Sequence, residues 1–209
     1  MLITWHGQYT IKIVSRNTIL LIDPHSPETG LTPLRVKTDI IALSNPQDKE
    51  MSHRKSLTGN PLIIDTPGEY SLSQLTLYAR GWHDEDGNER AFHRWHIENI
   101  TLLHVGSLNR KLEDTELQEL EDIDIDILFL PVGGGEGLDV EKALKLLTTV
   151  EPRIVIPIHY KVPKLNKDLA SVDQFAKEMG VSPKDAIPKL NITNSKLPAE
   201  GLETIILSP

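Results

Sequence analysis

The residues of this chain that are best placed for chemistry follow a short apolar run. The run Ile40–Leu43 predicts a buried strand, and Pro46 has no N–H for a strand ladder, so pairing should stop there. In layered α/β proteins, sites form where strands end and loops begin. The polar residues at this position are Asn45, Gln47, Asp48 and Glu50. Among them, only the two carboxylates would readily bind a metal.

Two histidines, His104 and His159, follow apolar runs in the second half of the chain, and we expect them to face each other. One interpretation is that both are structural residues held by hydrogen bonds. The other is a single-metal site made by both histidines with Glu50, and with Asp48 as a further ligand, which needs the loop to fold inward. A Ser–His pair with Ser107 is conceivable, but no G-x-S-x-G motif accompanies it.

Two further segments carry charge near the ends of expected strands. Asp23-Pro24 ends the run Thr18–Ile22, and we expect a turn whose carboxylate holds loop amides. The segment His83–Arg90, H-D-E-D-G-N-E-R, predicts a solvated charged loop.

Short β-rich runs dominate the first half, and β-loop-α units dominate the second. The expected strands are Ile3–Trp5, Thr10–Val14, Thr18–Ile22, Ile40–Leu43, Leu62–Asp65, one or two within Tyr70–Trp82, Ala91–Ile97, Ile100–Val105, Ile127–Leu130, Ile154–Ile158 and Thr204–Leu207. The expected helices are Lys111–Glu121, Asp139–Val150 with Asp139 as N-cap, and Ser171–Met179. This order predicts one α/β (α+β) domain over residues 1–209, with two sheets and helices outside.

Composition narrows the class of protein. The 209 residues are 39% apolar and 25% charged, as in ordinary globular proteins. No apolar run approaches the ~20 residues of a membrane-spanning helix, and no signal-peptide pattern is present. The absence of cysteine excludes thiolate chemistry. The same absence agrees with the cytoplasmic location that we expect. The net charge of −8 disfavours nucleic acid and anionic membranes as partners.

Six segments, in this order, resemble the metallo-β-lactamase superfamily, and in particular its branch of zinc-dependent hydrolases similar to ascorbate-6-phosphate lactonase. They are Trp5-His6-Gly7, Leu20-Leu21-Ile22-Asp23-Pro24, Thr66-Pro67-Gly68-Glu69-Tyr70, Leu103-His104-Val105-Gly106-Ser107-Leu108, Leu130-Pro131-Val132-Gly133-Gly134 and Ile156-Pro157-Ile158-His159-Tyr160. The resemblance implies a four-layer αββα sandwich with its site along one edge. It also suggests that His83-Asp84 could orient a substrate.

The chain departs from the pattern of that family at the metal ligands. The family carries Thr-His-x-His-x-Asp-His where this chain has S-N-P-Q-D-K-E over residues 44–50. The family's His-x-Gly-Asp corresponds here to the segment from His104 to Ser107, so that aspartate is also missing. Of the usual ligand set, this comparison leaves only His104 and His159.

The chemical consequence follows from what zinc requires. A catalytic zinc ion takes at least three protein ligands, and a carboxamide is a poor substitute for imidazole. Lys49, at the position of the family's aspartate, would repel a cation. Without the ion, water is not acidified and remains a weak nucleophile. The sequence therefore predicts that the family's dinuclear zinc hydrolysis fails here.

We therefore expect a non-catalytic member of the superfamily that binds a small molecule or a protein, with no cofactor and no assigned metal ligand. Its ligand-binding pocket is expected to contain Asn45, Gln47, Glu50, His104, Ser107 and His159. The alternative is a hydrolase of a small phosphoester or lactone, which uses one zinc or manganese ion or no metal. Whether the protein is an enzyme, its ligand and its oligomeric state stay open at this point.

Overall fold

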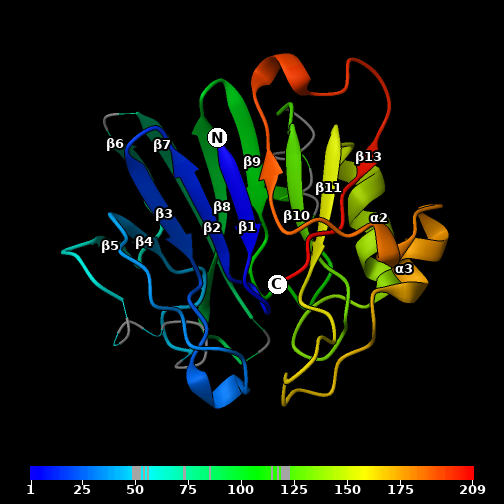
Figure 1. Cartoon of the computed structure of the whole chain (residues 1–209), viewed down its shortest axis with the longest axis horizontal. Helices are drawn as coiled ribbons and strands as arrows, with labels where there is room; N and C mark the ends of the chain where they lie inside the picture. The colour runs from blue at the N-terminus through cyan, green and yellow to red at the C-terminus, as the bar shows by residue number, and fades with distance from the viewer. Residues whose placement is uncertain are drawn as a thin grey trace.

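Two β-sheets face each other across one hydrophobic core in the computed structural model of this chain (Figure 1). The structure describes residues 1–48, 53, 55, 57–72, 74–84, 86–113, 115–116, 118 and 123–209. The largest side chains that are fully buried in this core include Trp5, Trp95 and Phe129. The predicted sandwich fold is therefore confirmed.

The first sheet is built from the N-terminal half and one late strand. In spatial order its strands are β12 (Leu190–Asn191), β1 (Leu2–Trp5), β2 (Ile11–Ser15), β3 (Thr18–Ile22), β4 (Ile40–Ala42) and β5 (Leu62–Ile64). Strands β1 to β3 pair antiparallel, whereas β3, β4 and β5 are parallel. The carboxyl ends of β3 and β4 therefore lie at the same edge.

The second sheet is antiparallel on one side and parallel on the other. In spatial order its strands are β13 (Glu203–Thr204), β11 (Ile154–Ile158), β10 (Ile127–Pro131), β9 (Ile100–His104), β8 (Glu89–Ile97), β7 (Leu75–His83) and β6 (Gly68–Leu72). Every residue of the parallel strands β10 and β11 is buried, which explains their continuous apolar sequences.

The turn between β8 and β9 shows why this hairpin forms at Glu98-Asn99. Both residues have positive φ, at 53° and 61°, as a two-residue hairpin of type I′ requires. Asparagine tolerates this conformation well, but glutamate does not. The Glu98 carboxylate accepts hydrogen bonds from the amino group of Met1 at 2.9 Å and from Ser15 Oγ at 2.7 Å. These contacts hold the less favourable residue in place.

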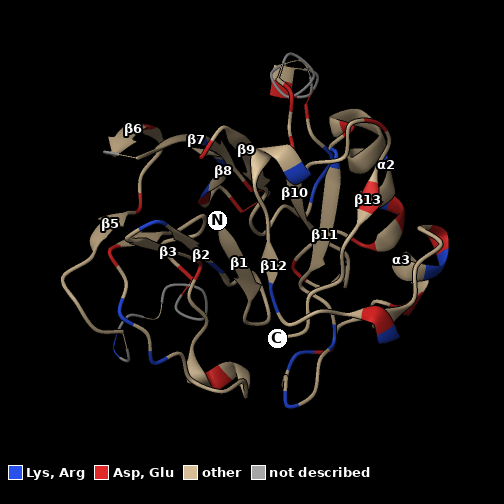
Figure 2. Ribbon diagram, turned by 45° about the horizontal axis from the view of Figure 1, so that its top comes forward, with Lys and Arg blue, Asp and Glu red and all other residues tan. Residues whose placement is uncertain are grey.

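Both described α-helices come from the second half of the chain. They are α2 (Val140–Val150) and α3 (Asp173–Glu178), which lie together beyond β11 in both views (Figures 1 and 2). Short 3-10 helices are η1 (Pro27–Thr29), η2 (Pro183–Asp185) and η3 (Asn194–Lys196). Charged residues gather on α2, α3 and the loops, while β1, β10 and β11 carry none (Figure 2).

The expected elements differ from the structure mainly at their ends. The predicted strand Thr204–Leu207 is wrong in extent: β13 ends at Thr204, and Leu207 instead forms a single bridge with Ile187. Strand β12 was not predicted, because two residues are too short for a periodic pattern. The predicted helix Lys111–Glu121 lies partly outside the described residues. None of the helices in the described part is long and apolar enough to span a membrane.

The N-cap role of Asp139 at the start of α2 can be tested by mutation. Its carboxylate accepts a hydrogen bond from the backbone N–H of Lys142 at 2.9 Å, as expected of an N-cap. We expect Asp139→Ala to lower the free energy of unfolding by ~1 kcal/mol in chemical denaturation. Asp139→Asn, which keeps an accepting oxygen, should cost much less. Equal losses in both variants would contradict the capping role.

Candidate ligand-binding site

A polar cavity of about 450 Å³ opens where strands of both sheets end. Its wall comes from the loop after β4, the connection between β7 and β8, and the loops that follow β9 and β10. Its volume lies within the ~300–1,000 Å³ that is usual for small-molecule sites. The described residues that line it are Asn45, Gln47, Asp48, Asp84, Asp86, Asn88, Arg90, Ser107, Asn109 and Glu136.

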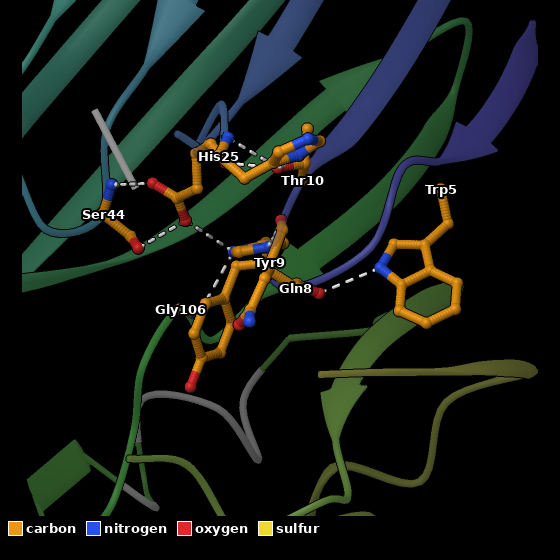
Figure 3. Close-up of polar contacts among 9 residues, drawn as sticks. Trp5, Gln8, Tyr9, Thr10, His25, Ser44 and Gly106 are labelled. Atoms are coloured by element: carbon orange, nitrogen blue, oxygen red, sulfur yellow. Dashed lines mark hydrogen bonds and ion pairs between the residues drawn. The ribbon is translucent and has the colours of Figure 1, made fainter. Parts of the chain in front are cut away.

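A buried carboxylate holds the loop that carries Asn45. The backbone N–H and the hydroxyl of Ser44 donate to the two oxygens of Asp23, at 2.7 and 2.6 Å (Figure 3). On its other side, the Ser44 carbonyl accepts a hydrogen bond from the Ala91 N–H at 2.8 Å. The ends of β3 and β4 and the start of β8 are thereby joined. The predicted role of Asp23, a strand-ending carboxylate that holds a loop amide, is confirmed.

The protonation of Asp23 depends on this burial. The side chain is fully buried, and burial raises its pKa to about 7, although the two hydrogen bonds from Ser44 act in the opposite direction. A carboxyl group with a raised pKa keeps its proton in the folded state at pH values where the unfolded chain has lost it.

His104 does not line the cavity, although the sequence placed it there. The Gly106 N–H donates to its Nδ1 at 3.2 Å, so Nε2 carries the proton and donates to the Tyr9 carbonyl at 2.9 Å (Figure 3). Its Nδ1 also lies 3.7 Å from the Asp23 carboxylate. Burial lowers the pKa of His104 to about 4, which keeps the ring neutral. Both nitrogens are therefore occupied within the fold.

His159 lies on the other side of Tyr9. The rings of Tyr9 and His159 stack at 4.1 Å between centroids, and the backbone N–H of His159 donates to the Gln8 carbonyl at 3.1 Å. Neither ring nitrogen of His159 has a hydrogen-bond partner. Burial, and secondarily Lys167, lower its pKa to about 3. The two histidines thus share a contact with Tyr9, and the described lining of the cavity contains neither.

A small gap beside Gly137 joins Tyr9 and His159. A Cβ atom added to Gly137 would lie 2.9 Å from both the Tyr9 hydroxyl and His159 Nδ1. The Tyr9 hydroxyl is buried and also lacks a partner. Burial raises the pKa of this phenol well above its ordinary value, and the nearby carboxylate of Glu136 acts in the same direction. One atom in this gap would lie within hydrogen-bond distance of both side chains.

Some of the strained backbone positions lie near these residues. Gln8, Asp23 and His159 all have positive φ, at 51°, 44° and 49°, a region that non-glycine residues rarely adopt. Such conformations cost ~1–3 kcal/mol each and cluster at functional sites. Asp23 and His159 directly follow the last residues of β3 and β11, and Gln8 directly precedes Tyr9 in the chain.

Three of the six predicted pocket residues do line the cavity. Asn45 and Ser107 are buried, and the Asn45 Oδ1 and Ser107 Oγ atoms have no hydrogen-bond partner among the described residues. Gln47 lines the more exposed part of the wall. Glu50 lies outside the described residues.

The connection between β7 and β8 contributes to the site, although the sequence favoured a solvated loop. Asp84 is buried and accepts hydrogen bonds from Arg90 at 2.6 and 3.0 Å and from the Asn88 side chain and N–H. Among the described residues of the segment His83–Arg90, the exposed ones are His83, Asp86, Gly87 and Glu89. The solvated-loop interpretation is therefore wrong for Asp84, because its ion pair with Arg90 fixes it in the wall. Opposite charges on either side of the Gly87-Asn88 turn were the available signal.

The pKa of Asp23 makes stability depend on pH in a defined direction. Between pH values near 4 and 7 the folded state binds more protons than the unfolded state, so this group makes the protein less stable as pH rises. Asp23→Asn removes that term while retaining an oxygen to accept from the Ser44 N–H. We expect the variant to gain stability relative to the native chain between pH 5 and pH 8 in urea denaturation. A difference that is constant with pH would contradict this.

Gly137→Ala tests the gap beside Tyr9. The added methyl group would lie too close to two stacked rings, so we expect a loss of ~1–3 kcal/mol in the free energy of unfolding. In a Tyr9→Phe background the close contact with the hydroxyl oxygen is absent and only the one with His159 Nδ1 remains, so the loss should shrink. Thermal denaturation of the double-mutant cycle measures this coupling, and strictly additive losses would refute it.

Solved structures share this fold. A protein of the metallo-beta-lactamase superfamily from Thermotoga maritima superposes with a TM-score of 0.79 at 24% identity, over 99% of this chain and 98% of that one. An isothiocyanate hydrolase from Delia radicum gut bacteria gives a TM-score of 0.70 at 14% identity, over 92% and 99% of the two chains. At these identities the likeness shows the fold alone.

Relatives in sequence are named as hydrolases. A UPF0173 metal-dependent hydrolase from Carboxydothermus hydrogenoformans is 24% identical over 219 residues, which cover 87% of this chain and 95% of that protein. One from Bacillus mycoides is 24% identical over 205 residues, or 80% and 89% of the two chains. These names imply a metal cofactor in the family. Our expectation that no cofactor takes part is therefore wrong.

A family model described as the beta-lactamase superfamily domain matches residues 2–159. That match covers more than half of the chain and includes all the strands whose ends surround the cavity. The order of the strands, the position of the cavity and this match agree: the chain belongs to the metallo-β-lactamase superfamily.

Proposed function

We propose that this chain binds a small polar molecule in the cavity at the strand ends and does not carry out the dinuclear zinc hydrolysis of its superfamily. The observation that supports this most directly is the pair Asn45 and Ser107. They stand where the resemblance places metal-ligating residues, and their buried polar atoms have no partner. Buried polar atoms are normally hydrogen-bonded, so a ligand that satisfies them is favoured.

The donor set around the cavity does not fit a two-ion centre. In the part of the chain that the structure describes, no group of three or more His, Cys, Asp or Glu residues is placed to hold a metal ion. Zinc requires at least three protein ligands, and Asn45, Gln47 and Ser107 supply none of the usual type. Ser44, which takes the first place in the motif, is bonded to Asp23. A complete ligand set cannot be drawn from these residues.

The residues of the wall are suited to orienting a ligand. Asn45 and Ser107 offer an acceptor and a hydroxyl from the buried side of the cavity, and the Asp84–Arg90 ion pair keeps the opposite wall in place. Tyr9 and His159, which lie outside the described lining, stay neutral, because burial moves both pKa values in the direction of the uncharged form.

Hydrolysis of a small phosphoester or lactone is the second candidate, and the names of the relatives favour it. Such an activity needs a base near the reacting water. His159 is one candidate, because neither of its ring nitrogens has a hydrogen-bond partner among the described residues. With a pKa of about 3 it is a weak base, because general bases work best with a pKa near the operating pH.

Metal analysis of the full chain separates the two candidates. The protein is incubated with zinc and manganese, and weakly bound metal is removed by dialysis. We expect inductively coupled plasma mass spectrometry to find fewer than two ions per chain. The Carboxydothermus relative, treated in parallel, is the comparison. Two tightly held ions per chain would contradict the proposal.

Assays of hydrolysis also separate the binding protein from the hydrolase. We expect no hydrolysis of generic phosphodiesters or lactones above the rate with buffer alone. Turnover that disappears in His159→Ala would support the hydrolase instead.

A further inference from the structure

We infer that the cavity takes a neutral, polyhydroxylated molecule such as a sugar or a polyol. This inference rests on the proposed function and names the class of ligand. It comes from the chemistry of the lining, from the two unpartnered buried atoms and from the way the charges in the wall are paired.

The lining is unusually rich in carboxamides. Four of its described residues carry one, and a serine hydroxyl accompanies them: Asn45, Gln47, Asn88, Asn109 and Ser107. A carboxamide presents an accepting oxygen next to donating N–H groups. A vicinal diol presents the same combination, since each hydroxyl both donates and accepts. The described lining contains no aromatic or aliphatic side chain, so an apolar ligand would gain little there.

The buried end of the cavity lacks two hydrogen bonds. Asn45 is 2% exposed and Ser107 is 8% exposed, and both have a polar atom without a partner. Asn45 Oδ1 can only accept a hydrogen bond, whereas Ser107 Oγ can donate or accept. A ligand hydroxyl can donate to the first, and a ligand hydroxyl can donate to or accept from the second. A buried acceptor without a donor is costly, so a ligand that supplies O–H groups is selected.

Two carboxylates in the wall, Asp84 and Glu136, form ion pairs with cations of the protein. The Arg90 guanidinium donates to Asp84 at 2.6 and 3.0 Å, and Lys167 pairs with Glu136 at 2.6 Å. The guanidinium is therefore not available as a phosphate clamp. The described lining holds four carboxylates and this one guanidinium, so a phosphate would be repelled. A neutral ligand avoids this cost.

Asn88 shows how the wall is held ready for such a ligand. Its amide nitrogen lies 3.2 and 3.1 Å from the two oxygens of Asp84, which fixes the plane of the amide. Gln47 and Asn109 are more exposed and stand nearer the solvent. The Asn88 amide is thus held by Asp84, whereas the exposed amides of Gln47 and Asn109 can adjust to a ligand.

Titration of the full chain with matched probes tests the inference. The neutral probes are myo-inositol, D-glucose and D-mannitol. Cyclohexanol has the ring of inositol without its vicinal hydroxyls, while inorganic phosphate and spermidine test anions and cations. We expect saturable binding of at least one polyol by calorimetry, and none of cyclohexanol, phosphate or spermidine.

Variants locate the binding. Ser107→Ala and Asn45→Ala should each weaken polyol binding by about tenfold or more. Because Ser107 Oγ has no partner without ligand, Ser107→Ala should leave the melting temperature unchanged, so that loss of binding is not loss of folding. Asn191→Ala, on the exposed side of β12, is the matched control and should bind as the native chain does.

Three results would overturn the inference: no saturable binding of a neutral polyol, binding of phosphate or spermidine in preference to polyols, or polyol binding that both pocket variants leave unchanged. Preference for a charged probe would remove the polyol class but leave the proposed binding function in place. Two tightly held metal ions with turnover would defeat the proposed function instead, by a measurement that does not involve these probes.

Discussion

The buried bond between Asp23 and Ser44 is the constraint on which the rest of the site depends. It joins the ends of two neighbouring parallel strands, and the same serine carbonyl binds the start of β8 in the other sheet. A carboxyl group in this position is unfavourable unless it is bonded or protonated, and Asp23 is bonded to both donors of Ser44 with a pKa near neutrality. The sandwich therefore has a fixed point at the edge where the cavity opens.

Tyr9 organises the interior next to this point. Its carbonyl accepts from His104, and its ring stacks on His159. These contacts explain why two histidines that resemble ligands in sequence do not line the cavity: one is bonded within the fold, and the other lies against the tyrosine ring. Neutral rings fit such a buried position, because a charged imidazole would lose its hydration without gaining a partner.

The position of the cavity follows from the fold, whereas its lining depends on the residues of the loops. It lies at the carboxyl ends of β4, β9 and β10, where layered α/β folds place their sites. Its described wall consists of four carboxamides, a hydroxyl, four carboxylates and one guanidinium, so it offers many hydrogen bonds and carries a net negative charge. Such a surface can form hydrogen bonds with a polar ligand. The sequence relatives are named metal-dependent hydrolases, and the family match covers the strands whose ends surround this cavity.

The sequence by itself determined most strands of the sandwich and the N-cap of α2, because these depend on neighbouring residues and on periodicity. Only the tertiary structure decided which polar atoms are bonded. The contact of His104 with Tyr9, the ion pair in the β7–β8 connection and the meeting of Asn45 with Ser107 in one wall are examples. Hydrogen bonds between segments distant in the chain leave no local sequence pattern. The burial of each polar atom and its hydrogen-bond partner could therefore be identified only from the tertiary structure.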